Sequence, residues 1–326
     1  MNDFKATISS GRTFIMGCAM ISILLFHQFF LSEGPLWFFW GAFHRFGHWG
    51  VDIFLFVSGF GIVHSLRKNS LKVYFSNRLL RLLPSCLIAG LVFGTLHLFG
   101  IGGMPVYETN SLFLIFTSLW LWYVFAILIY YAVAPFALKG IDRWGGWVFV
   151  AAELLFIACT YCLPTPPKDA FLLVKRIPWV IQRFPVFVLG MWLATKRFGY
   201  SLKVILPVAV CSIVAAVLIR GCRGIGFIKE DCSYLFVALS MPAVCWFLGL
   251  CKGWFDKLHI AAPVEWLGKY SLELYIVQWP IFNFVWDLFP SVPKPLMLLL
   301  ALMFACVFAY LLKLCADWVT RLVRNV

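Results

Sequence analysis

The chain has 326 residues, of which 63% are hydrophobic and only 13% are charged, and its formal net charge is +13. A soluble globular chain carries about 25% charged residues, so this composition excludes a soluble protein and indicates an integral membrane protein. The basic residues are scattered over loops, which argues against a nucleic-acid partner and is typical of topogenic residues that also favour anionic membrane lipid.

Apolar runs of about 20 residues recur along the whole length, and each can cross a hydrocarbon core of about 30 Å as a helix. The sequence therefore predicts an all-α polytopic membrane bundle that forms a single domain over residues 1–326. Pro178, Arg183 and Pro185 interrupt the sixth run and make it the weakest. In chain order, the ten expected spans are 13–31, 50–66, 82–100, 111–136, 146–163, 178–195, 203–220, 233–250, 271–289 and 295–315.

The distribution of Lys and Arg over the loops predicts the orientation of this bundle. With ten spans both termini lie on one side, and most of the 27 basic residues fall in loops on that side. We therefore expect both termini and the loop 67–81 to be cytoplasmic in a multi-pass protein of the cell membrane.

Ionisable residues inside spans are costly and usually mark a site or a pathway. His27 lies about 14 residues into the first span, so it is about 20 Å from the cytoplasmic end of that helix. Asp52 enters the second span from outside, at a similar depth. A histidine and a carboxylate on adjacent helices suit a base and its orienting group, or a hydrogen-bonded clasp between the helices. Chemistry alone leaves both interpretations open.

The third span leaves the cytoplasm with the sequence SNRLLRLLP, which puts Arg78 and Arg81 three residues apart on one helical face. Two guanidinium groups that point the same way suit phosphate recognition. Topology alone also explains basic residues on the cytoplasmic side, although it does not require this spacing.

The other polar positions give weaker signals. Most of the 11 cysteines lie inside apolar spans, where cysteine behaves as a small hydrophobe, and we expect no metal site. Cys222 and Cys232 share one exterior loop, and whether they pair is open. The exterior loop before the second span holds His44, Arg45 and His48, which we expect to be solvated.

Six motifs follow one another from the first span to the ninth. They are LLFHQ at 24–28, GVDIFLFVSGFGI at 50–62, RLLRLLP at 78–84, LWY at 121–123, RFPVFVLGM at 183–191 and LGKYSLELYIVQWP at 267–280. As an ordered set, they resemble the acyltransferase-3 family of membrane acyltransferases.

This resemblance implies a membrane O-acyltransferase. Members of the family move acyl groups, commonly acetyl from acetyl-CoA, to sugar hydroxyls of surface polysaccharides, lipid-linked glycans or secreted molecules. Acyl-CoA would be the cosubstrate, with no permanently bound cofactor. His27 would act as the general base and Asp52 would fix the tautomer of its ring, with a covalent acyl-histidine relay left open. Ser58 is expected to support close helix packing rather than to react.

The resemblance also suggests where the two substrates bind. Arg78 and Arg81 would hold the phosphates of CoA while the thioester approaches His27 through the bundle. Trp122 and Tyr123 either line that route or pack in the core. The remaining candidates are Arg183, which binds substrate charge or pairs with Asp52 or Glu153, and Glu153 itself.

Two positions depart from the pattern of the family. Met16 stands where the family commonly has an arginine, and Arg12, one turn earlier on the same face, is a candidate substitute for donor binding. Gln278 stands where the family commonly has a histidine, so this position keeps a hydrogen bond but loses proton transfer.

The main alternative is a transporter or flippase for a lipid-linked glycan, which would share the spans and the few buried charges. A membrane sensor or scaffold has no evident need for His27 and the arginine pair.

Overall fold

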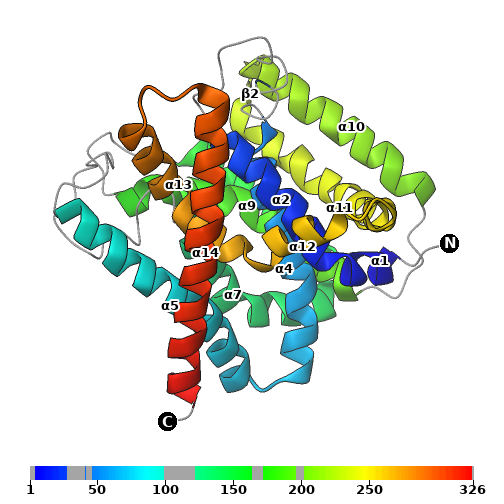
Figure 1. The fold of residues 1–326 in the computed structure, drawn as a ribbon. Coiled ribbons are helices and arrows are strands. Elements are labelled where there is room, and N and C mark those ends of the chain that lie inside the picture. The colour runs from blue at the N-terminus through cyan, green and yellow to red at the C-terminus, as the bar shows by residue number, and fades with distance from the viewer. Residues whose placement is uncertain are drawn as a thin grey trace.

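The protein is a bundle of helices in the computed structural model, which describes residues 4–27, 41, 46–98, 122–163, 172–195 and 202–324 (Figure 1). Its helices are α1 Phe4–Ser10, α2 Arg12–Phe26, α4 Trp49–Lys68, α5 Leu71–Leu98, α7 Trp122–Trp144, α8 Trp147–Cys162, α9 Leu172–Thr195, α10 Leu202–Gly221, α11 Ser233–Lys257, α12 Ala261–Lys269, α13 Ser271–Leu288 and α14 Lys294–Arg324.

Each predicted span overlaps one of these helices, but the predicted number of ten spans is not confirmed. Within the described ranges, seven helices are long and apolar enough to cross a membrane, namely α4, α5, α7, α9, α10, α11 and α14. The pair α1 and α2 makes an eighth if it counts as one span, although it bends by 67°. At 16 residues α8 rises only about 24 Å, which is short of a typical hydrocarbon core. Helix α13 carries Glu273, Gln278 and Asp287, which reduce its hydropathy.

Several helices extend beyond the predicted spans, among them α5, α9, α11 and α14. Helix α5 begins at Leu71, eleven residues before the apolar run, because Lys72, Arg78 and Arg81 are compatible with helix even though they are not apolar. Helix α9 continues through Pro178 and Pro185. The part of the predicted fourth span before Trp122 lies outside the described residues.

Helix α4 packs along α9 through two glycines that face each other's backbone. A Cβ atom added at Gly59 would lie 2.1 Å from the carbonyl oxygen of Phe187, and one at Gly190 would lie 2.3 Å from that of Phe56. Small residues of this kind let membrane helices approach closely. The expectation that the SGFG sequence serves helix packing is confirmed at Gly59.

Helix α2 is held in the same way by α12, a helix that the sequence did not predict. A Cβ atom added at Gly17 would lie 1.9 Å from the carbonyl oxygen of Val264, and one at Gly268 would lie 1.9 Å from that of Thr13. Helix α14 packs beside α13 and α5, whereas α10 lies at the periphery of the bundle beside α11 (Figure 1).

The loop between α10 and α11 folds into a small hairpin. Strands β1 Gly224–Ile225 and β2 Ile228–Lys229 pair antiparallel, and the 3-10 helix η3 Glu230–Cys232 leads into α11. Cys222 and Cys232 are both free thiols, so the disulfide that the sequence left open is not formed.

Candidate functional site

His27 follows the last residue of α2 and lies against α13. Its ring centroid is 5.0 Å from that of Phe26 and 5.4 Å from that of Trp279, both in edge-on geometry. Its backbone N–H still donates to the carbonyl oxygen of Ile23, at 3.2 Å. The histidine therefore sits where α2 ends and where the LYIVQWP motif of α13 passes beside it.

Asp52 is completely buried in the first turn of α4, and its ion-pair partner is Arg183 of α9. The distance from Arg183 Nε to Asp52 Oδ1 is 3.5 Å. Arg183 was expected to bind substrate charge or to pair with Asp52 or Glu153, and the pair with Asp52 is the one that forms. The ion pair joins α4 and α9, which share the most extensive helix contact in the described part of the bundle.

Aromatic side chains complete the surroundings of Arg183, which is almost fully buried. Its Nη2 donates to the Tyr234 hydroxyl oxygen at 3.1 Å, and its Cζ lies 4.3 Å from the Tyr234 ring centroid. On another side Cζ lies 4.8 Å from the ring centroid of Trp122. A guanidinium held by a carboxylate, a hydroxyl and two aromatic faces has the contacts that make a buried charge tolerable.

His48, expected in a solvated loop, is in fact buried, with 7% of its surface exposed. Two contacts draw the start of α4 onto α2 and cause this burial. Ser22 Oγ donates to the carbonyl oxygen of Gly47 at 3.1 Å, and a Cβ added at Gly50 would lie 2.6 Å from the carbonyl oxygen of Ala19.

The imidazole of His48 lies between aromatic rings, one helical turn before Asp52. Its centroid is 5.7 Å from that of Phe26 and 5.8 Å from that of Tyr234. Neither ring nitrogen has a hydrogen-bond partner among the residues that the structure describes. Burial, with the nearby charges of Arg183 and Arg220, lowers the pKa of His48 well below its usual value, so the ring is neutral near pH 7. His44 and Arg45 lie outside the described residues.

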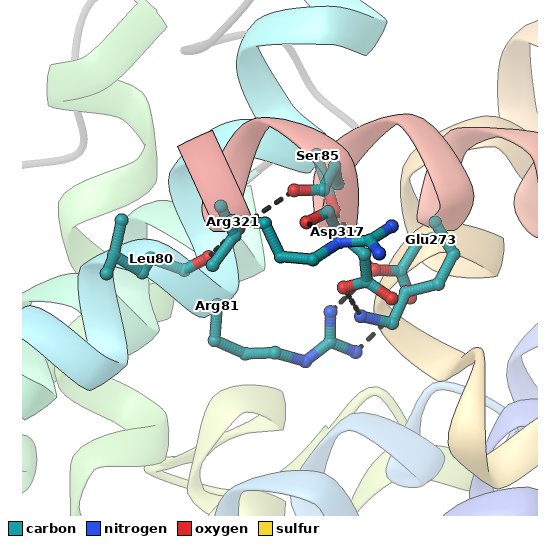
Figure 2. Close-up of polar contacts among 9 residues, drawn as sticks. Leu80, Arg81, Ser85, Glu273, Asp317 and Arg321 are labelled. Atoms are coloured by element: carbon teal, nitrogen blue, oxygen red, sulfur yellow. Dashed lines mark hydrogen bonds and ion pairs between the residues drawn. The ribbon is translucent and has the colours of Figure 1, made fainter. Parts of the chain in front are cut away.

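Arg81 is partly exposed, and its guanidinium pairs with a buried carboxylate. Figure 2 shows its guanidinium directed at Glu273 of α13, with Nη1 2.5 Å from Oε1 and Nη2 3.2 Å from Oε2. Ser85 Oγ, one turn further along α5, donates to Oε1 of the same carboxylate at 3.0 Å. Glu273 is completely buried, and a buried carboxylate requires such partners.

Arg78 points to a different set of partners, although it lies only three residues from Arg81. Its Cζ is 5.4 Å from the ring centroid of Tyr131 and 5.9 Å from that of Tyr74. Arg12 of α2 lies within electrostatic range of Arg78. The structure therefore places Arg12 and Arg78 in electrostatic range of each other and directs Arg81 at α13.

The guanidinium of Arg12 rests against α4. A Cβ added at Gly61 would lie 3.2 Å from Arg12 Cζ, so the absence of a side chain there makes room for the arginine. The charges of Arg12 and Arg78 have no carboxylate partner within the described part of the chain. Two cations in electrostatic range of each other, without an acid among the described residues, suit an anionic ligand.

Tyr123 connects the arginine end to α13. It lies beside Ser58 and in electrostatic range of Arg12, and its ring centroid is 5.3 Å from that of Tyr275. The carbonyl oxygen of Tyr275 accepts a hydrogen bond from Gln278 Nε2 at 3.4 Å. Trp279, four residues after Tyr275 on the same face of α13, contacts His27. A row of aromatic and polar side chains thus runs from the arginine pair to the histidine.

The last candidates differ in their surroundings. Gln278 is buried, and its Oε1 has no hydrogen-bond partner in the described ranges. Glu153 is partly buried in α8, and neither of its carboxylate oxygens has such a partner there. Among the described residues, no group of three or more His, Cys, Asp or Glu side chains is placed to hold a metal ion.

Comparison with protein families supplies the decisive observation. The acyltransferase-3 family model, described as an acyltransferase domain, matches residues 15–314 and so covers nearly the whole chain. The chain belongs to the acyltransferase-3 family. Searches of curated proteins and of solved structures found no match.

The resemblance stated from the motifs is therefore confirmed, and the protein is a multi-pass membrane acyltransferase. The match spans His27, Asp52, the arginines of α5 and the whole aromatic row. Membership of an acyltransferase family argues against the transporter or flippase alternative.

Proposed function

We propose that this acyltransferase moves acetyl, or another short acyl group, from acyl-CoA to a hydroxyl of a surface or lipid-linked glycan at the cell membrane. The observation that carries the proposal is the row of side chains that leads from Arg12 and Arg78, which lack a carboxylate partner in the described ranges, to His27. Its two ends suit two different substrates, one anionic and one with a hydroxyl to deprotonate.

Arg12 and Arg78 bind the phosphates of CoA in this proposal. Planar guanidinium groups form paired hydrogen bonds with phosphate oxygens, and these two lack a carboxylate in the described structure. Arg81 was also expected to bind the donor. Because Glu273 already occupies its guanidinium, we assign it the supporting task of holding α5 on α13.

His27 is the general base at the other end. It takes the proton of the acceptor hydroxyl as that oxygen attacks the thioester carbonyl, and the carbon–sulfur bond then breaks. The imidazolium returns its proton to the departing CoA thiolate, so the histidine is regenerated. Help of this kind contributes about 10²–10⁴-fold in rate.

Asp52 and Arg183 position the helices beside this base. Their ion pair ties the start of α4 to α9, next to the ring of Trp122. Trp122, Tyr123 and Gln278 lie along the proposed route of the acyl group. Gln278 donates and accepts hydrogen bonds but does not transfer a proton.

The test uses purified protein in liposomes with labelled acetyl-CoA and a lipid-linked oligosaccharide. We expect label to enter the glycan only when acetyl-CoA is supplied on the side of Arg78. Movement of glycan across the bilayer without acetyl-CoA, and without label transfer, would favour a flippase instead.

A further inference from the structure

Helix α9 carries a stripe of Arg176, Trp179 and Arg183, spaced three and four residues apart on one face. Cζ of Arg176 lies 3.9 Å from the ring centroid of Trp179. Trp122 of α7 stands edge-on to Trp179, with centroids 5.6 Å apart, and its ring also faces Arg183 at 4.8 Å. These four residues form an arginine–tryptophan stack in which the two rings lie between the two cations.

The two arginines of this stack differ in their charge balance. Arg183 has Asp52 as its counter-ion, whereas no carboxylate pairs with Arg176 in the part of the chain that the structure describes. Arg176 is only 6% exposed, and its Nε has no hydrogen-bond partner there. A shielded cation without an acid is expensive, so this position is suited to an incoming anion.

The stack also offers a surface on which a sugar can rest. Trp179 keeps 37% of its surface exposed although it contacts both Arg176 and Trp122. An indole face packs well against the apolar face of a pyranose ring, while a guanidinium beside it binds a charged substituent.

The stack lies apart from the proposed donor site but beside the route of transfer. Two residues of α4 give the separation: Asp52 contacts Arg183 of the stack, and Gly61 contacts Arg12 of the donor site. They are nine residues apart, which is about 14 Å along the helix. Tyr275, a member of the row that leads to His27, lies in electrostatic range of both Arg176 and Arg183.

We propose that the arginine–tryptophan stack binds a negatively charged group on the acceptor glycan, so that this enzyme prefers acidic acceptors over neutral ones. The inference rests on the proposed function for its acceptor class. The charged group is either the carboxylate of an acidic sugar or the phosphate of a sugar phosphate, and the guanidinium of Arg176 binds both in the same way.

Binding tests the stack without any need for acyl transfer. Purified protein in phosphatidylcholine nanodiscs is titrated with methyl glucoside, methyl glucuronide and glucose 1-phosphate, and the melting temperature is followed. We expect at least one of the two charged sugars to bind about tenfold more tightly than the neutral one, as one charged hydrogen bond provides. Tighter binding of methyl glucuronide would identify a carboxylate as the bound group, and tighter binding of glucose 1-phosphate would identify a phosphate.

Two variants of Arg176 and one matched control complete the experiment. Arg176→Gln should remove the preference for charge and leave binding of methyl glucoside unchanged, and Arg176→Lys should retain part of it. Arg143→Gln removes an arginine that also stacks on a tryptophan, Trp144 at 5.2 Å, but on an exposed surface, and should change nothing.

Equal binding of all three sugars by the wild type, or an equal loss of charged and neutral sugars in Arg176→Gln, would overturn the inference. In parallel, acyl transfer from acetyl-CoA to the same sugars is measured. If the wild type transfers acyl to none of them while the charge preference persists, the proposed function fails and the anion site stands.

Discussion

Arg78 and Arg81 lie three residues apart on α5 but contact different residues, so we expect Arg78 to bind the donor and Arg81 to stabilise the fold. Replacing Arg78 by glutamine removes a cation that lies over the Tyr131 ring and has no acid partner in the described ranges. We therefore expect the KM for acyl-CoA to rise about tenfold, with little change in melting temperature. Replacing Arg81 by glutamine leaves the buried carboxylate of Glu273 without its bidentate partner. Because the Arg81 side chain is 40% exposed, we expect a moderate destabilisation of about 1–3 kcal/mol.

Steady-state kinetics and thermal melting of both variants separate these outcomes. The double variant Arg81→Gln with Glu273→Gln is the control, because it removes both charges and should recover part of the stability. A larger KM effect in Arg81→Gln than in Arg78→Gln would contradict the division of tasks.

The ion pair of Asp52 and Arg183 predicts a second result at the scale of single residues. Asp52→Asn leaves a buried guanidinium uncompensated, so we expect it to destabilise the protein by about 3–5 kcal/mol. The double variant Asp52→Asn with Arg183→Gln should be more stable than the sum of the single changes implies. Melting in detergent measures this cycle, and strictly additive losses would show that the two residues do not act as a pair.

Sequence reasoning found some of the ionisable residues of the site but missed others, and it missed most of their partners. The family motifs pointed to His27, Asp52 and Arg183, because charges stand out in apolar runs. They did not reveal that Arg81 faces α13, since the partner Glu273 lies nearly 200 residues away. His48 was missed because a loop was assumed to be solvated. Its spacing of four residues from Asp52 on one helical face was a signal that could have been used.

At the scale of elements, the close crossing of α4 and α9 depends on the lack of a side chain at Gly59. A Cβ there would meet the backbone of Phe187 at 2.1 Å, and backbone cannot yield as a flexible side chain can. We therefore expect Gly59→Ala to lower the melting temperature, against the usual gain of about 1 kcal/mol for alanine over glycine inside a helix.

Gly253→Ala is the matched control for that substitution. Gly253 is also helical, in α11, and nothing lies within 4 Å of a Cβ added there, so this variant should be as stable as the wild type or more stable. If both alanine variants behaved alike in thermal melting, close backbone packing would not explain the glycine in α4.

The positions of helices followed largely from hydropathy, and their exact limits did not. Long apolar runs predicted a helix at all ten expected places. A helix satisfies the backbone N–H and C=O groups of an apolar run within the run itself, as a membrane requires. The short α12 was missed, since its nine residues are too few for a span, although Ala261 and Val264 pack on Phe14 of α2 and two glycines bring the helices close. Local sequence does not report a partner helix, so these tight contacts emerge only from the assembled bundle.

At the scale of the whole molecule, orientation is still a prediction from the Lys and Arg of the loops. We expect the turn between α4 and α5, which includes Asn69 and Ser70, to face the cytoplasm together with both termini. Single cysteines placed at Ser70 and in the hairpin at Phe227, in a background without native cysteines, provide the measurement. An impermeant maleimide on intact cells should label position 227 and not position 70, and the reverse pattern would place the proposed donor site outside.

Hydropathy located the helices but did not predict how many of them are long and apolar enough to span the membrane. Helices α8 and α13 lie at predicted spans, but one is short and the other carries buried polar groups. Those polar groups contribute to the candidate site, so the same residues that mark α13 as functional make it a weak span by composition. Fold class followed from the whole composition, whereas the path of each functional helix required its tertiary contacts.

The central claim is that His27 takes the proton from the acceptor hydroxyl. Steady-state acyl transfer from labelled acetyl-CoA by purified His27→Ala tests it most directly, with His64→Ala as a control because His64 is exposed on α4. The account predicts that His27→Ala loses turnover by about 10²–10⁴-fold while its melting temperature and its KM for acetyl-CoA stay near those of the wild type, and that His64→Ala is fully active. A folded His27→Ala protein with wild-type turnover would contradict the account.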